Sequence, residues 1–255
     1  MLSIDLNCDM GESTHLWQYT INKDLSLLPF LSSVNLACGF HAGDAHTMHE
    51  LVQAATTAGA AIGAHPGYED RDNFGRTNVV LSPEKIYDIV LYQIGALDAF
   101  LKVNNGRLHH VKPHGALYNM AAKDEILASA ICKAVYDYDP RLVLYGLSGS
   151  MLIAAAHATG LKTCSEVFAD RTYQDDGQLT PRTEPNAMIH DTQQALCQVL
   201  QMVQQRRVTS VNGKEVPIVA ETICIHGDGP HAAEFAKAIH ALLRANHITI
   251  QHPLS

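Results

Sequence analysis

The sequence predicts an α/β protein built on a parallel sheet, and two observations support this class. Seven short apolar runs recur along the 255 residues, and stretches with helical periodicity separate them. The runs are apolar almost throughout, as expected of strands that are covered on both faces. Strands that alternate with helices pair in parallel. Seven such units can close into a barrel or remain an open, doubly wound sheet, and the pattern leaves both open.

The individual elements can be placed in order along the chain. The strands are predicted at 2–6, 34–37, 60–64, 108–111, 142–147, 163–168 and 223–225. Helices are predicted at 48–58, 83–97, 122–137, 149–159, 187–207 and 230–245. The clearest helix begins with Ser82 as N-cap and Pro83 as its first residue, while Gly59 ends the one before it. Asn212 and Gly213 predict a type I′ hairpin late in the chain.

Composition limits the classes of function. The chain is 47% apolar and carries no linker, so we expect one domain over 1–255. Its net charge of −8 argues against a nucleic-acid partner. No apolar stretch approaches the ~20 residues of a membrane span, and the first residues do not resemble a secretion signal, so we expect a cytoplasmic protein. The six cysteines form no C-x-x-C pair, and neither disulfides nor structural zinc is expected.

Polar clusters follow six of the seven predicted strands. They are DLNCDMGE (5–12), NLACGFHAGD (35–44), HPGYEDRDNFGR (65–76), KPHGALYN (112–119), EVFADRTY (166–173) and HGDGP (226–230). The carboxyl ends of parallel strands lie together at one end of a sheet or barrel. We therefore expect these clusters to form one site.

The two-residue period of a strand indicates which side chains share a face. The matching sets are Asp5, Asn7 and Asp9; Asn35 and His41; Lys112 and His114; His226 and Asp228. Carboxylates, imidazoles and a lysine would then crowd one pocket. Such crowding shifts pKa values and suits general acid–base chemistry.

Some polar residues have a simpler interpretation. His46 and His49 are spaced i, i+3 and could hold a metal, but a solvated helix face is favoured. Cys38 is expected to be a buried thiol and not a nucleophile. Four arginines in loops after strands could equally hold an anion or be exposed: Arg71, Arg76, Arg171 and Arg182. The chain has no G-x-x-x-x-G-K-[ST] loop, G-x-G-x-x-G fingerprint, G-x-S-x-G elbow or H-E-x-x-H motif.

At the six clusters the sequence resembles the LamB/YcsF family. The resemblance covers essentially the whole chain and includes DLNCDMGE, NLACGFHAGD, VKPHGALYN and ICIHGD. It implies a seven-stranded parallel (β/α) barrel of the TIM-barrel type, related to polysaccharide deacetylases. It also implies a part in an ATP-dependent 5-oxoprolinase, which opens the lactam of 5-oxo-L-proline to L-glutamate together with subunits B and C.

On this basis we expect two groups of site residues. The catalytic set is Asp9, Glu12, His41, Asp44, Lys112, His114, Glu166 and His226. The substrate-binding set is Asp5, Asn7, Asn35, His65, Asp170, Arg171 and Asp228. Within these sets a carboxylate would act as base on water, a histidine would protonate the leaving nitrogen, and Lys112 and Arg171 would neutralise phosphate or carboxylate.

Cofactors and alternatives follow from the same resemblance. ATP with Mg²⁺ is expected in the assembled complex, and a homo-oligomer is compatible with the sequence. The H-x-x-x-H pair of related deacetylases is broken here, because Ala45 stands four residues after His41. A metal, if bound, would use Asp9, His41 and His65. Two other functions stay open: a metal-dependent deacylase acting on a small amide or N-acetyl sugar, and a non-catalytic binding subunit.

Overall fold

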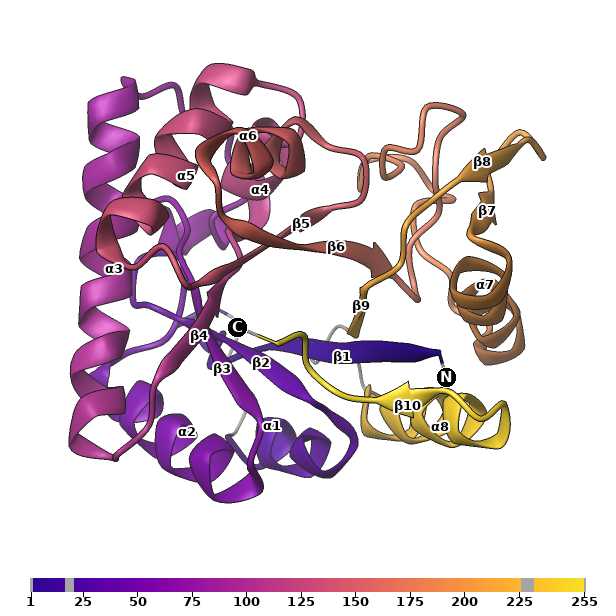
Figure 1. Ribbon diagram of the computed structural model, residues 1–255, viewed down its shortest axis with the longest axis horizontal. Helices are drawn as coiled ribbons and strands as arrows, with labels where there is room; N and C mark the ends of the chain where they lie inside the picture. The colour runs from indigo at the N-terminus through magenta and orange to yellow at the C-terminus, as the bar shows by residue number, and fades with distance from the viewer. Residues whose placement is uncertain (1, 17–20, 226–231, 255) are drawn as a thin grey trace.

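The computed structural model describes residues 2–16, 21–225 and 232–254. Seven parallel strands follow one another around a closed ring, which is completed where β1 pairs with β9 (Figure 1). The ring consists of β1 (Ser3–Met10), β2 (Ser33–Ala37), β3 (Ala61–His65), β4 (Leu108–Val111), β5 (Val143–Leu147), β6 (Lys162–Phe168) and β9 (Thr222–Ile225). The predicted strands are thus confirmed, and they form a barrel of the TIM type and not an open sheet.

Helices surround the barrel (Figure 1). They are α1 (Ile21–Leu27), α2 (Ala45–Ala58), α3 (Pro83–Val103), α4 (Gly115–Ala121), α5 (Glu125–Tyr138), α6 (Met151–Thr159), α7 (Thr192–Gln205) and α8 (Ala232–Ala245). Short 3₁₀ turns lie at Leu28–Phe30 and Arg71–Asn73. Figure 1 shows α7 beside a small hairpin on the side of the barrel away from α3.

The helix termini agree with the sequence signals. The Ser82 hydroxyl accepts a hydrogen bond from the Lys85 amide at the start of α3, as an N-cap does. Gly59 ends α2 in the left-handed region, with φ of +73°. The buried face of α3 includes Ile86, Val90 and Leu97, which join a core between helices and barrel.

Three local predictions are wrong. The helix predicted at 187–207 begins at Thr192, because Asp191 caps it by accepting from the Gln194 amide. The helix predicted from residue 122 begins at Glu125, because Asp124 caps it by accepting from the Ile126 and Leu127 amides. The hairpin of β7 (Arg207–Thr209) and β8 (Glu215–Pro217) does not have a type I′ turn. Its loop spans 210–214, and Gly213 has a positive φ while Asn212 does not, whereas type I′ needs both.

The sequence analysis did not predict α1, α4 or β10 (Thr249–Ile250), a short strand that adds to the barrel sheet. β10 pairs in parallel with Ser3 and Ile4, the first residues of β1. Among the helices of the described ranges, none has the length and apolar composition that crossing a bilayer requires.

Candidate active site

The first strand carries a ladder of polar side chains up the inside of the barrel. Asp5, Asn7 and Asp9 bond to side chains of other barrel strands, whereas Leu6 and Cys8 belong to the core outside it. This arrangement follows from the two-residue period predicted from the sequence. A barrel interior is normally filled with branched apolar residues, so the polar ladder indicates a site.

Asp5 lies in the lowest layer of this ladder. Its carboxylate accepts hydrogen bonds from the hydroxyls of four residues: Ser32, Ser33, Tyr145 and Thr222. Burial raises the pKa of Asp5, and these hydroxyl donors oppose the rise. In the structure, hydroxyls of the barrel interior occupy the Asp5 carboxylate, and its contact with substrate stays a prediction.

Asn7 and Asn35 form the middle layer. The Asn7 amide donates to Glu166 Oε1 at 3.0 Å and to the Thr222 hydroxyl at 2.6 Å. The Asn35 amide donates to Asn7 Oδ1 at 2.7 Å and to Asp9 Oδ1 at 2.8 Å. Both asparagines thus orient carboxylates of the upper layer, and both are fully buried.

Lys112 joins the two carboxylates above this layer. Its Nζ lies 2.8 Å from Asp9 Oδ1 and 2.8 Å from Glu166 Oε1, and the residue is only 2% exposed. Burial lowers the pKa of Lys112, but the negative charges around it, Asp9 above all, raise it well above the usual value. Burial alone would raise the pKa of Asp9, but the positive charges of His65 and Lys112 outweigh burial and lower it. The charged Lys112 therefore forms ion pairs with carboxylates of the protein itself.

Four side chains converge at the mouth of the barrel: Glu12, His41, His65 and His114. Their ligand atoms all lie within 4.8 Å of one another. Glu12 Oε1 lies 3.0 Å from His41 Nε2, 3.4 Å from His65 Nε2 and 2.9 Å from His114 Nδ1. His41 stacks on His114 with ring centroids 3.7 Å apart. The cluster adjoins Asp9, whose Oδ2 is 3.4 Å from His65 Nε2.

The electrostatics of the cluster divide the histidines. Burial, assisted by His114, lowers the pKa of His41 to about 3, so this ring is neutral. Burial also disfavours charge on His65, but Asp9 and Glu12 outweigh it and raise the pKa of His65 to about 9. Burial alone would raise the pKa of Glu12. The neighbouring imidazoles outweigh burial, with the largest effect from His114, and hold this pKa well below its usual value. The mouth thus combines ionised carboxylates with an imidazolium, the components of acid–base catalysis.

The loop after β3 closes over this cluster. Gly75 has φ of +63°, and a Cβ there would lie 2.7 Å from the His41 Cβ and 2.9 Å from His114 Cδ2. Only glycine fits both the backbone angle and the space. The HPGYEDRDNFGR segment therefore encloses the histidines as well as supplying His65.

Two other predicted site residues have structural partners. Asp44 is exposed and caps α2, accepting from the His46 and Thr47 amides. The Arg171 guanidinium donates to the carbonyls of Thr180 and Ala187, so it fastens its own loop. Burial lowers the pKa of Arg171 to about 10.

The remaining predicted residues are less informative. Asp170 is half-buried beside Arg171, and its carbonyl accepts from the Ile189 amide. His226 and Asp228 lie outside the described residues. Cys38 is buried as expected, which raises the pKa of its thiol to about 12.

Sequence reasoning missed two side chains that contact the site. The Tyr118 hydroxyl donates to Glu166 Oε2 at 2.7 Å, and His110 Nε2 lies 2.7 Å from Asn35 Oδ1. Both could have been found. Tyr118 belongs to the KPHGALYN cluster, and His110 has the same strand parity as Lys112.

The possible metal ligands also differ from those predicted. The predicted set is Asp9, His41 and His65, whereas the ligand atoms within 4.8 Å of one another belong to Glu12, His41, His65 and His114. The alternative pair on α2 does not converge: His46 lies 3.6 Å from Glu50 and His49 contacts Gln53.

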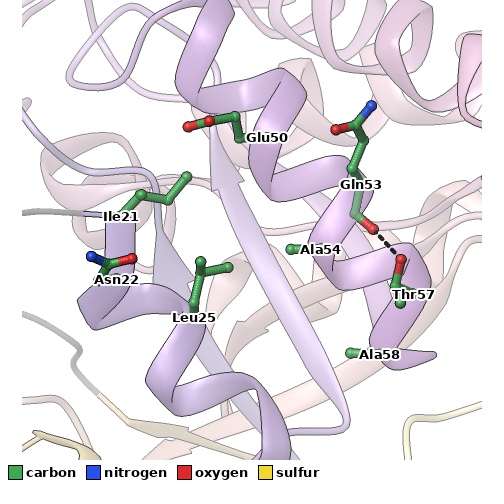
Figure 2. A pocket seen from close by; sticks show the side chains of 8 residues that line it. All are labelled: Ile21, Asn22, Leu25, Glu50, Gln53, Ala54, Thr57 and Ala58. Atoms are coloured by element: carbon green, nitrogen blue, oxygen red, sulfur yellow. Dashed lines mark hydrogen bonds between the residues drawn. The ribbon is translucent and has the colours of Figure 1, made fainter.

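A separate hollow lies on the outer layer between α1 and α2 (Figure 2). Its lining side chains include Leu25, Glu50 and Thr57, and they are exposed or half-buried. Figure 2 shows the Thr57 hydroxyl bonded to the Gln53 carbonyl of its own helix. The buried polar cluster in the barrel, and not this hollow, has the charges and convergent geometry of an active site.

Comparison with known proteins gives a consistent result. The sequence matches the LamB/YcsF family over residues 4–255. It is 56% identical to the A subunit of 5-oxoprolinase from Shouchella clausii, over 98% of each chain, and 57% identical to that from Geobacillus thermodenitrificans, over 98% of this chain and 97% of the relative. The crystal structure of the lactam utilization protein from Thermus thermophilus superposes with a TM-score of 0.91 at 43% identity, covering 99% of this chain and all of that one. With a match of this extent, the chain belongs to the LamB/YcsF family.

Proposed function

We propose that this chain is the A component of an ATP-dependent 5-oxoprolinase. The observation that carries the proposal is full-length similarity, at 51–57% identity, to relatives that bear the name of this 5-oxoprolinase component. The buried cluster of carboxylates and histidines supports it, because lactam opening requires proton transfer to the ring nitrogen and activation of water.

The reaction consists of two coupled hydrolyses. In the first, the carbon–nitrogen bond of the 5-oxo-L-proline ring breaks, water supplies the hydroxyl of the new carboxylate, and the nitrogen takes a proton to give L-glutamate. Opening this five-membered lactam is unfavourable near neutral pH, so ATP is converted to ADP and phosphate with a second water. The nucleotide binds with Mg²⁺ in a complex with subunits B and C.

Within this reaction the residues take separate roles. An ionised carboxylate at the mouth, Glu12 or Asp9, accepts a proton from the attacking water. His65, as an imidazolium, donates a proton to the leaving nitrogen. Lys112 is a positioning residue, since it holds Asp9 and Glu166 through hydrogen bonds of 2.8 Å. This revises the expectation that Lys112 binds substrate phosphate.

The decisive measurement is 5-oxoproline-dependent ADP and glutamate release, with and without subunits B and C. We expect turnover only with the complete set, and loss of turnover in the complex that contains Glu12→Gln. Absence of 5-oxoproline-stimulated ATP hydrolysis in the complete set would reject the function. Full turnover with Glu12→Gln and His65→Gln would instead support a non-catalytic binding role.

A metal-dependent amide hydrolase is the second candidate. The convergence of Glu12, His41, His65 and His114 favours it. Hydrolysis of a small amide by this chain alone, without ATP and blocked by EDTA, would replace the first proposal with the second.

A further inference from the structure

Two imidazoles at the barrel mouth have their outer nitrogens fixed by main-chain carbonyls. His65 Nδ1 lies 2.7 Å from the Lys112 carbonyl, and His114 Nε2 lies 2.8 Å from the Phe74 carbonyl. A carbonyl oxygen can only accept, so each outer nitrogen carries a hydrogen. When these rings are neutral, the inner nitrogens of His65 and His114 carry no hydrogen, and their lone pairs point into the cluster.

The two nitrogens lie close to each other and to an oxygen of the Glu12 carboxylate. His65 Nε2 and His114 Nδ1 are 2.9 Å apart, and they lie 3.4 Å and 2.9 Å from Glu12 Oε1. A single proton can bridge one pair of these atoms but cannot join all three. Lone pairs of the three atoms repel one another at these distances, and a cation that binds all three at once removes this repulsion. We propose that Glu12, His65 and His114 are the ligands of a zinc-type divalent metal ion, which displaces the second proton of His65 when it binds. The proton-transfer roles proposed above for Glu12 and His65 therefore apply only without the ion.

The dimensions fit this ion. Ligand atoms about 2.0–2.1 Å from zinc and separated by a tetrahedral angle lie about 3.3–3.4 Å from one another. The three observed separations, 2.9–3.4 Å, approach this value, and small rotations of the side chains complete the match. All three residues are buried. Their outer N–H groups already have the carbonyl partners that orient metal-bound histidines.

His41 takes a different part from the one expected. Within the described part of the chain its buried Nδ1 has no hydrogen-bond partner. The ring hydrogen therefore resides on Nε2, which donates to Glu12 Oε1 at 3.0 Å. A nitrogen that carries a hydrogen cannot bind a metal, so His41 orients the ligand Glu12 instead.

Three protein ligands leave a fourth position open, the arrangement of catalytic zinc sites. An ion held there can polarise an amide carbonyl oxygen or lower the pKa of a bound water. Because the site is defined by its ligands, this inference does not depend on ATP coupling or on which amide is the substrate.

Metal binding is measured directly on the full chain after treatment with EDTA. Calorimetric titration with Zn²⁺ should show one equivalent bound, and Co²⁺ should give the visible absorption of a low-coordinate site. His65→Ala and His114→Ala should each weaken binding by more than about 100-fold. His41→Gln should keep the stoichiometry and lose at most about 10- to 100-fold, the usual effect of an outer partner.

The matched control is the double variant His46→Ala/His49→Ala, which removes two exposed imidazoles from α2 and should bind as the wild type does. Glu12→Gln preserves side-chain shape and serves if a histidine variant fails to fold, as judged by circular dichroism. The proposal is overturned if the wild type binds no zinc in excess metal. It is equally overturned if binding survives loss of Glu12, His65 or His114, or is lost in the α2 double variant.

Discussion

At the scale of single residues, the strongest constraint in the barrel is the pairing of Lys112 with Asp9 and Glu166. The ammonium group and the Glu166 carboxylate are buried and the Asp9 carboxylate is half-buried, and each contact measures 2.8 Å. Removing ions from water is unfavourable, so the arrangement is stable only while all three members are present. Asn7 adds a hydrogen bond to Glu166 and fixes the geometry further.

Replacing Lys112 with methionine tests this dependence. Lys112→Met leaves the buried Glu166 and the half-buried Asp9 without their cation and should lower the free energy of unfolding at pH 7 by about 3–5 kcal/mol. In the wild type the pKa of Asp9 is lowered, so its stabilising contribution is present above the unfolded pKa of ~4 and is lost as the pH falls below it. In the variant Asp9 loses the charge of Lys112 that helps to lower its pKa and accepts a proton more readily, so the difference in stability from the wild type should narrow between pH 7 and pH 5.

Urea unfolding at both pH values measures the effect. The control is Lys133→Met, because Lys133 is exposed and its partner Asp137 lies on the same helix surface. An exposed pair contributes little, so this variant should unfold almost as the wild type does. Equal destabilisation by the two substitutions would show that the buried triad has no special role.

Some residue-scale features could not have been predicted from sequence. Gly63 occupies a barrel strand without any turn signal, yet a Cβ there would lie 2.1 Å from His110 Nε2. The ring of His110 crosses this space to reach Asn35. The need for glycine depends on the pairing of β3 with β4, a contact between residues distant in sequence.

At the scale of elements, α2 shows how a polar cluster residue can have a structural role. Asp44 belongs to the NLACGFHAGD cluster and was expected near the chemistry. Its side chain instead accepts from the amides of His46 and Thr47, which the first turn of a helix leaves unpaired. Sequence spacing alone did not distinguish a base from a cap, because an aspartate in the loop between a strand and a helix suits either role.

Two substitutions separate these roles. Asp44→Ala should lower the free energy of unfolding by about 1 kcal/mol through loss of the cap. Asp44→Asn keeps the capping oxygen and should match the wild type both in stability and in the activity of the reconstituted complex. Thermal unfolding and 5-oxoproline turnover are the measurements. A stable but inactive Asp44→Asn variant would return Asp44 to the catalytic set.

Element prediction succeeded where local signals were strong. The start of α3 at Pro83 followed from Ser82 and Pro83, and the strands followed from their apolar runs. It failed for α4 and β10, whose residues carry weak periodicity and are defined by packing. The hairpin turn was wrong because Ser210 and Gly213 form the tight turn, so that Asn212 keeps a negative φ.

At the scale of the whole molecule, closure of the barrel creates the site. The pairing of β1 with β9, which matches Asp5 with Thr222 and Asn7 with Cys224, brings Asp9 beside Lys112 and Glu166. Apolar patterning could not decide between a barrel and an open sheet, since both bury strands on two faces. The alternation of polar residues along β1 was more informative, because Asp5, Asn7 and Asp9 share one face of the strand and a closed barrel gives that face an enclosed interior.

Closure also predicts how the molecule opens. In a closed barrel β1 and β9 have neighbours on both sides, so their amides should exchange with solvent only through global unfolding. Among the residues that the structure describes, the β7–β8 hairpin forms a separate two-stranded sheet and pairs with no barrel strand, so local opening should expose it at lower free energy. Native-state hydrogen exchange in low urea should therefore give β1 and β9 the global free energy of unfolding, with a matching urea dependence. The hairpin should exchange at least about tenfold faster, with a weaker dependence. Early exchange along β1 and β9 would mean that they behave as sheet edges, and the enclosed site derived from their pairing would then be wrong.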